Sequence, residues 1–194
     1  SGREVPHNLG VAPEMMWVKN RSVGGRWAVY SSSLGSGNTD YLNLETNNGK
    51  TAFGSQNVWN NTDPTSIVFS VGNYSWVNTS GATYIAYLFA SVSGISKVGS
   101  YTGTAADLNV DCGFSAGARF VLIKRTDSSG DWYVWDSLRG IVAGNDPYLL
   151  LNTTAAQVTN TDYVDPLASG FTVTSSAPAA LNASGGTYIF YAIA

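Results

Sequence analysis

Residues 25–30, with the sequence GRWAVY, return as residues 130–135, GDWYVW, 105 positions further along the chain. Each copy follows a stretch of turn-forming residues, SVGG at 22–25 and DSSG at 127–130. A short run of Trp, Val and Tyr that leaves a glycine-containing turn is typical of the second strand of a β-hairpin. The repeat therefore predicts two similar hairpins in one chain.

Three further blocks recur in the same order and at nearly the same spacing. Residues 16–19 match 121–124, residues 41–46 match 148–153, and residues 78–85 match 182–189. Each block is short, rich in Val, Ile, Tyr, Trp and Thr, and bounded by turn-forming residues, as β-strands are. Repetition over such a period indicates two units of one type. The sequence predicts an all-β fold of two tandem, sequence-related antiparallel β-sandwich modules, residues 1–93 and 94–194.

The last predicted strand of each module, residues 84–90 and 188–194, is apolar on both faces. Such a run suits a strand buried on two sides within its own module, or one covered by a neighbouring module or subunit. Module two also opens with a predicted first strand, residues 97–103, that has no counterpart in module one. We expect either that the chain is a fragment of a longer array or that another chain supplies this strand, because an unpaired edge favours association.

The composition argues against several classes of partner and cofactor. Charged residues make up 12% of the chain, and the net charge is −3. Nucleic acid and anionic membranes normally need a basic patch, so neither is an expected partner. A single cysteine, Cys112, excludes an internal disulfide, and a single histidine, His7, excludes every two-histidine metal motif. We expect no cofactor, and only a calcium site of loop carboxylates stays open.

Four stretches carry a family resemblance: residues 6–19 (PHNLGVAPEMMWVK), 130–136 (GDWYVWD), 144–148 (GNDPY) and 182–189 (NASGGTYI). They are similar to motifs of tandem β modules in structural proteins of tailed bacteriophages, especially tail-fibre-like proteins. The resemblance implies a place on the surface of the extracellular virion, contact with other virion proteins and contact with a host surface. It also implies a homo-oligomer, often a trimer in such fibres, and it implies no catalytic residues.

Aromatic residues found in only one module are candidates for ligand binding, because the shared fold does not require them. Module one carries Trp59, Tyr74 and Trp76 near Asn61 and Asp63. Exposed rings offer flat apolar faces, and Asn and Asp offer hydrogen-bond partners for hydroxyl groups, a combination that suits sugar binding. The alternative is that Trp76 points inward from a strand and that Trp59 caps the core beneath a loop.

Module two has a second candidate cluster in its longer loop, formed by Asp136, Arg139, Asn145 and Asp146. Asp146 precedes Pro147, and this pair is also an ordinary turn signal. The cluster therefore has a purely structural alternative.

Catalysis is not expected. Glycoside hydrolysis usually needs two carboxylates that flank the sugar bond, and the chain has only three glutamates, Glu4, Glu14 and Glu45, with most aspartates in turn-like sequence. The favoured hypothesis is a non-enzymatic virion structural protein, a tail-fibre or similar appendage segment that contributes to host-surface attachment, with a host cell-surface glycan as a candidate partner. Two alternatives stay open: a carbohydrate-binding module or lectin of a cellular surface protein, and a ligand-free spacer or capsid decoration protein.

Overall fold

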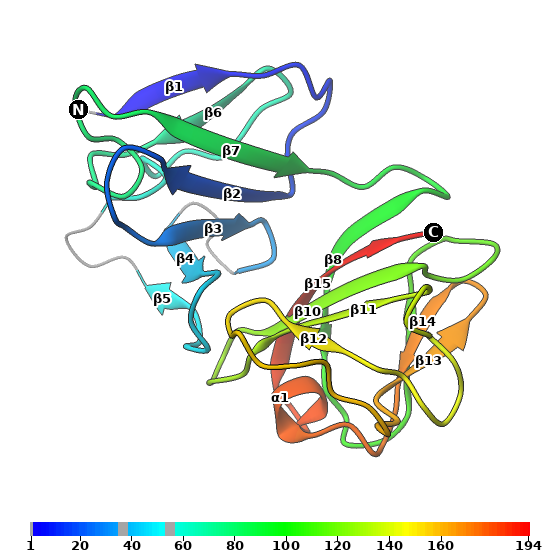
Figure 1. Cartoon of the computed structure of the whole chain (residues 1–194). Helices are drawn as coiled ribbons and strands as arrows, with labels where there is room; N and C mark the ends of the chain where they lie inside the picture. Colours follow the sequence, from blue (N-terminus) through cyan, green and yellow to red (C-terminus); the bar gives the residue numbers. More distant parts are fainter. Residues whose placement is uncertain (1, 35–38, 53–56) are drawn as a thin grey trace. The chain divides into compact units, whose positions relative to one another are not determined.

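The computed structural model describes residues 2–34, 39–52 and 57–194 (Figure 1). These residues form antiparallel β-sheets and a single short helix, α1 (Ala179–Asn182). The prediction of an all-β fold is therefore confirmed at the level of fold class.

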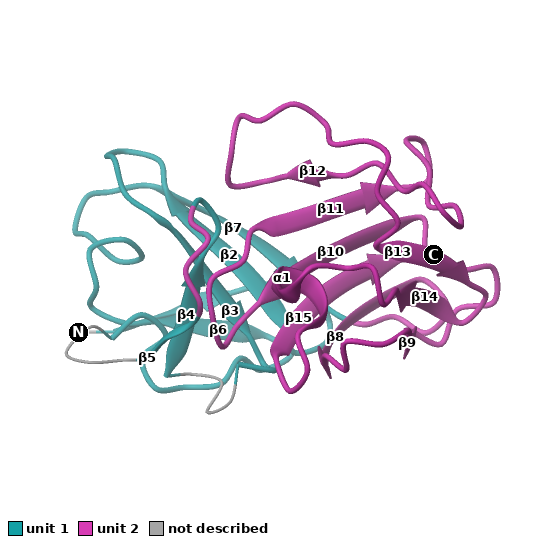
Figure 2. Cartoon of the chain, turned by 90° about the horizontal axis from the view of Figure 1, so that it is seen from below, with its two compact units in different colours: residues 1–45, 50–90 teal, residues 46–49, 91–194 magenta. Residues whose placement is uncertain are grey.

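The chain divides into two compact units, which Figure 2 draws in separate colours. Unit 1 comprises Ser1–Glu45 and Lys50–Ala90, and unit 2 comprises Thr46–Gly49 and Ser91–Ala194. The division after Ala90 lies close to the boundary expected after residue 93. A short segment from the first half of the chain, Thr46–Gly49, nevertheless belongs to unit 2.

The described residues of unit 1 form two antiparallel sheets. The larger has the strand order β5-β4-β3-β2-β7, and the smaller pairs β1 with β6. The strands are β1 (Arg3–Pro6), β2 (Met15–Asn20), β3 (Trp27–Ser31), β4 (Asp40–Asn43), β5 (Thr51–Ala52), β6 (Val68–Val71) and β7 (Tyr84–Phe89).

Unit 2 also has a larger and a smaller antiparallel sheet. Their strand orders are β12-β11-β10-β15-β8 and β13-β14-β9. The strands are β8 (Ser96–Thr102), β9 (Leu108–Asp111), β10 (Phe120–Arg125), β11 (Trp132–Asp136), β12 (Leu149–Leu150), β13 (Val164–Leu167), β14 (Gly170–Val173) and β15 (Thr187–Ile193).

The strand registers of the two larger sheets match position by position. Lys19 of β2 faces Trp27 of β3, and Lys124 of β10 faces Trp132 of β11, at the offset of the sequence repeat. The next strand of each sheet also has a counterpart, because β3 pairs antiparallel with β4 as β11 pairs with β12. In unit 1 the hairpin turn is closed by Asn20, whose side-chain oxygen accepts the Ser22 and Val23 N–H groups at 2.9 and 3.2 Å. This is a local Asx arrangement that favours a turn over a longer strand.

Each unit has one apolar core to which both of its sheets contribute. In unit 1, Val18 and Tyr30 of the larger sheet belong to the same buried cluster as Phe69 and Val71 of β6. In unit 2, side chains of β10, β11 and β15 share a cluster with Phe171 and other residues of β9 and β14. Alternate positions along each strand supply these core side chains, because successive side chains of a strand point to opposite faces of its sheet.

The outer edges of the two larger sheets differ. Strand β15 is paired on both sides, with β10 and with β8, and Tyr188, Ile189 and Phe190 are buried. Strand β7 pairs with β2, and no strand of the described residues lies on its other side. Ile85 and Tyr87 of β7 are 36% and 45% exposed, so burial on two sides holds for β15 and not for β7.

Candidate functional site

Trp59 lies in the core of unit 1 and has no exposed surface. Its indole N–H donates to the main-chain oxygen of Asp40 at 3.2 Å, and its ring meets Tyr30 edge to face at 5.7 Å. A ring without exposed surface cannot stack on a sugar. Trp59 is thus a core residue, as in the structural alternative, and it leaves the set of candidate ligand-binding residues.

Asp146 is also fully buried, in unit 2. Its two carboxylate oxygens accept the N–H groups of Tyr163 and Val164 at 2.8 and 3.0 Å. Burial raises the pKa of this carboxyl to about 6, although both hydrogen bonds act in the opposite direction. Its position ties the loop before β12 to the start of β13. The structure therefore gives Asp146 a structural place and no access to a ligand.

The other three residues of the module-two cluster form contacts within one loop or between two loops. Asp136 forms an ion pair with Arg139 and accepts the N–H groups of Leu138 and Arg139, which closes a turn after β11. The Asn145 side chain accepts the N–H of Asn160 at 3.0 Å. These contacts account for the residues without a ligand.

Asn61 and Asp63 are exposed in the loop that follows Trp59. Asn61 has a positive φ of 50°, a conformation that Asn adopts more readily than most residues. Asp63 lines a shallow pocket of about 300 Å³ with Glu14, Tyr30 and Pro64 among its other residues. Burial raises the pKa of Tyr30 to about 12, with a smaller contribution from the charge of Asp63.

Tyr74 and Trp76 are the predicted aromatic residues that the structure brings together at the surface. Their ring centroids lie 4.6 Å apart in an edge-on arrangement, and both side chains are half-buried. Trp76 also meets the ring of Tyr41 at 6.1 Å, and the guanidinium of Arg26 lies 5.4 Å from the Trp76 ring centre. The two rings therefore have a fixed geometry beside a cation.

Glu45 completes this surface, which we call the aromatic corner and define as Arg26, Glu45, Tyr74 and Trp76. Glu45 lies 4.0 Å from Arg26, and its other carboxylate oxygen accepts the Trp27 N–H at 3.0 Å. The corner thus places an aromatic face beside charged hydrogen-bond donors and acceptors, which is the chemistry that pyranose rings and their hydroxyl groups need.

Arg26 and Glu45 were not among the residues predicted from the sequence. The signal was present in the repeat, because their counterparts in unit 2 are Asp131 and Asn152, while the neighbouring Trp is the same in both copies. In unit 2 the Asn152 amide donates to the Asp131 carboxylate at 2.7 Å, so a hydrogen bond without a cation replaces the ion pair.

A cavity of about 490 Å³ opens beside β7, and no feature of the sequence predicted it. Its apolar lining includes Val18, Phe69, Val71, Val77 and Tyr84. The cavity lies between the two sheets of unit 1, since β2 and β7 contribute to one wall and β1 and β6 to the other.

No group of three or more His, Cys, Asp or Glu side chains suited to a metal ion occurs in the described part of the chain. Burial raises the pKa of the Cys112 thiol to about 12, which keeps it protonated and unreactive near neutral pH. Within the same residues, no helix has the length and apolar character needed to cross a membrane.

A family model described as a domain of unknown function, DUF7483, matches residues 1–194. The chain belongs to this family. The DUF7483 match covers both units, so the two together are the stretch that the family model describes. Searches of curated proteins and of solved structures found no match.

Proposed function

We propose that the chain is a non-enzymatic structural and binding segment of a virion appendage such as a tail fibre, and that it contacts host-surface glycans through the aromatic corner of unit 1. The observation that carries this proposal is the half-exposed Tyr74–Trp76 pair beside Arg26 and Glu45. All four positions carry other residue types in the repeated sequence of unit 2. Residues that the common architecture does not need are free to serve a ligand.

In this proposal the two units are related β-sandwich modules. The matching registers of the larger sheets and the single core shared by the two sheets of each unit support that view. Modules of this kind suit an extended appendage, because each folds around its own core and can be added in series.

The geometry of the corner supports a carbohydrate ligand. The Trp76 ring is held by Tyr41 on one side and by Arg26 on another, so little side-chain entropy is lost when a sugar stacks on it. Arg26 and Glu45 offer a donor and an acceptor at the rim. Such a site binds weakly by itself, and a homo-oligomer would convert several weak contacts into avidity.

The test is binding of the labelled full chain to a glycan panel and to candidate bacterial cells. We expect saturable binding that Trp76→Ala weakens by at least about tenfold, because the stacking platform is removed. Tyr87→Ala is the matched control, since Tyr87 is an exposed aromatic residue of the same unit outside the corner. It should bind as the unchanged chain does.

Equal binding by Trp76→Ala and the unchanged chain would contradict the proposed site. Failure of the folded chain to bind any glycan or cell would favour a ligand-free spacer or decoration protein. Antibodies against the chain should label the appendages of purified phage particles. Labelling confined to a cellular surface would favour a lectin of a cellular protein.

A further inference from the structure

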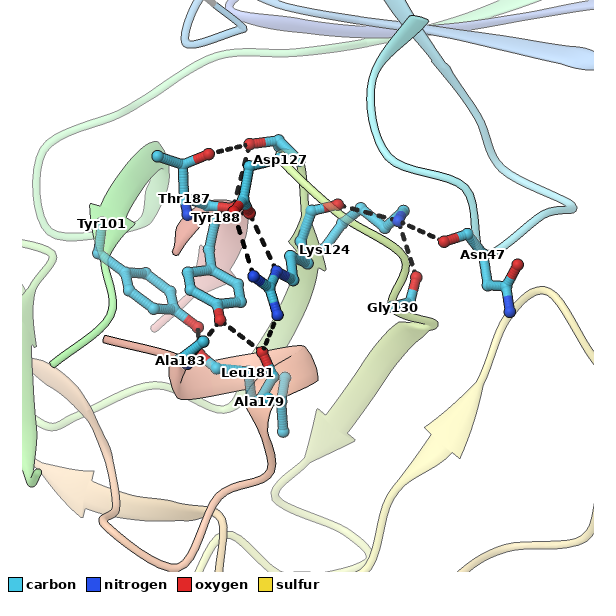
Figure 3. A network of polar contacts seen from close by, with 12 residues as sticks. Asn47, Tyr101, Lys124, Asp127, Gly130, Ala179, Leu181, Ala183, Thr187 and Tyr188 are labelled. Atoms are coloured by element: carbon cyan, nitrogen blue, oxygen red, sulfur yellow. Dashed lines mark hydrogen bonds and ion pairs between the residues drawn. The ribbon is translucent and has the colours of Figure 1, made fainter. Parts of the chain in front are cut away.

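The outer edge of the larger sheet in unit 2 shows how such an edge is completed. Strand β8 pairs with β15 over its whole length. The ring of Tyr101 stacks on that of Tyr188 with 4.8 Å between centroids and 12° between planes, and its hydroxyl donates to the Leu181 oxygen at 2.8 Å (Figure 3). Strand β8 thus supplies both a ladder of main-chain hydrogen bonds and an aromatic side chain that packs against the core.

The residues after β8 are held as well. The Asn182 side chain accepts the Thr104 N–H at 2.9 Å and donates to the Ala106 oxygen at 2.9 Å. The N–H of Gly103 donates to the Gly186 oxygen at 2.8 Å, which extends the pairing beyond the strand.

Unit 1 carries the counterparts of the residues that hold this strand. Tyr84 corresponds to Tyr188, and its hydroxyl oxygen accepts the Thr79 N–H at 2.6 Å, as that of Tyr188 accepts the Ala183 N–H at 2.7 Å. Asn78 corresponds to Asn182, and its amide donates to the Gly72 oxygen at 2.7 Å, as that of Asn182 donates to the Thr174 oxygen. Both units therefore contain the residues that surround the place that β8 occupies in unit 2.

In unit 1, the 490 Å³ cavity is lined by Tyr84 and Val77, the repeat counterparts of the Tyr188 and Leu181 that Tyr101 contacts in unit 2. Tyr84 and Ala86 of β7, together with Val77, line this cavity beside the open edge. The N–H of Arg21 donates to the Thr83 oxygen at 2.8 Å, so the main-chain groups of Thr83 point toward β2. Because main-chain groups alternate in direction along a strand, those of Tyr84, Ala86 and Leu88 point toward the open edge.

We infer that the β7 edge of unit 1 is an acceptor for a separate extended peptide strand of the β8 type, which adds antiparallel to β7 and inserts a tyrosine beside Tyr84. This is strand addition to a sheet edge, in which main-chain hydrogen bonds give affinity and side-chain pockets give specificity. The structure holds its own example of the occupant, since residues 96–106 take the equivalent place in unit 2. The site uses no residue of the aromatic corner, so this inference and the proposed function fail independently.

The cavity also predicts one difference in sequence between the bound peptide and β8. A Cβ atom on Gly99 would lie 2.6 Å from the far end of the Phe190 ring, so any larger residue opposite Phe190 would force that ring to move. The counterpart of Phe190 in unit 1 is Ala86, which leaves room at the facing position. The occupant therefore carries a tyrosine and, two residues before it, a branched apolar residue.

The experiment titrates the full chain with labelled synthetic peptides of residues 96–106 and follows fluorescence anisotropy. The unaltered peptide should bind, and Tyr101→Ala in the peptide should weaken binding by at least about tenfold. Gly99→Val in the peptide should tighten binding severalfold. Against a chain with Ala86→Phe, the order should invert, because the phenyl ring then collides with valine and not with glycine.

Amide NMR shifts locate the bound peptide, and the main-chain N–H groups of Tyr84, Ala86 and Leu88 should move most. Three results would overturn the inference: no saturable binding of either peptide by the folded chain, shifts confined to β15, or a concentration-dependent dimer that protects the β7 edge without peptide. The last result would make a second copy of the chain the occupant. The peptide comparisons on the unchanged chain suffice if Ala86→Phe does not fold.

Discussion

Strands β7 and β15 hold corresponding places in their sheets, yet β15 is buried and β7 is exposed along much of its length. Both have a run of apolar residues, and both pair on one side with the first strand of a hairpin. The difference lies in the neighbour on the other side, which is β8 in unit 2. The comparison shows that an apolar run indicates that a strand can be buried, whereas its actual burial depends on whether a partner strand covers it.

Each unit has a buried aspartate, and the carboxylates of the two have different partners. A tryptophan indole donates at 3.2 Å to the main-chain oxygen of Asp40 in unit 1 and of Asp146 in unit 2. The Asp40 carboxylate pairs with Lys50 at 2.8 Å, whereas that of Asp146 accepts the Tyr163 and Val164 N–H groups at 2.8 and 3.0 Å. A carboxylate that is buried without a cation is the more sensitive to pH.

Loss of the Tyr101 ring should have the largest effect on stability. Tyr101→Ala removes the ring stacked on Tyr188 and leaves a void in the core of unit 2, so we expect the free energy of unfolding of this unit to fall by about 2–4 kcal/mol. Tyr101→Phe keeps the ring, removes only the hydrogen bond to Leu181, and should cost about 1 kcal/mol. Urea unfolding, followed through amide NMR signals of β15, measures both.

Equal effects of the two substitutions would mean that the ring adds nothing to the completed edge. The Tyr101 side chain of β8 would then not stabilise unit 2, and the filled edge would have no energetic advantage from it over the open edge.

Asp146 predicts a smaller effect that depends on pH. Its pKa of about 6 lies above the ordinary value of 3.8, so between these two pH values the unfolded chain has released a proton that the folded chain retains. The unfolded state then binds fewer protons, and stability falls as pH rises from about 4 to about 6, by roughly 1–2 kcal/mol. Thermal unfolding between pH 4 and pH 7 measures this slope.

Asp146→Asn should remove most of the slope, at the cost of one main-chain hydrogen bond. A smaller slope should remain, because burial and the nearby charge of Asp162 also raise the pKa of Asp165. Stability that rises steadily from pH 4 to pH 6 would contradict the assignment of a raised pKa to Asp146.

The internal repeat predicted the strands that recur in both units, but β1, β5, β6, β9, β13 and β14 lie outside the repeated blocks. Each repeated block is a strand or a strand with its turn, and the offset of 105 between Lys19 and Lys124 reappears in the hairpin registers. The repeat could not assign Thr46–Gly49 to unit 2, because this depends on contacts such as the hydrogen bond from Gly130 to the Asn47 oxygen, between residues far apart in sequence.

The candidate site was predictable only in part. Residue type and uniqueness pointed to Tyr74 and Trp76, and equally to Trp59, which is buried. All three residues lie in loops or turns, so which ring faces outward depends on how these segments pack over the core, and local composition does not encode this packing. Arg26 joins the site through its position over the Trp76 ring, a contact that spans about half of unit 1 in sequence.

The central claim, that the sheet edge is open in unit 1 and filled in unit 2, is tested most directly by residue-resolved hydrogen exchange of the free chain. The N–H groups of Tyr84, Ala86 and Leu88 should exchange at least about 100-fold faster than the corresponding groups of Tyr188, Phe190 and Ala192, which face β8. Equal protection of the two sets would contradict the account, because it would mean that a strand already covers the β7 edge.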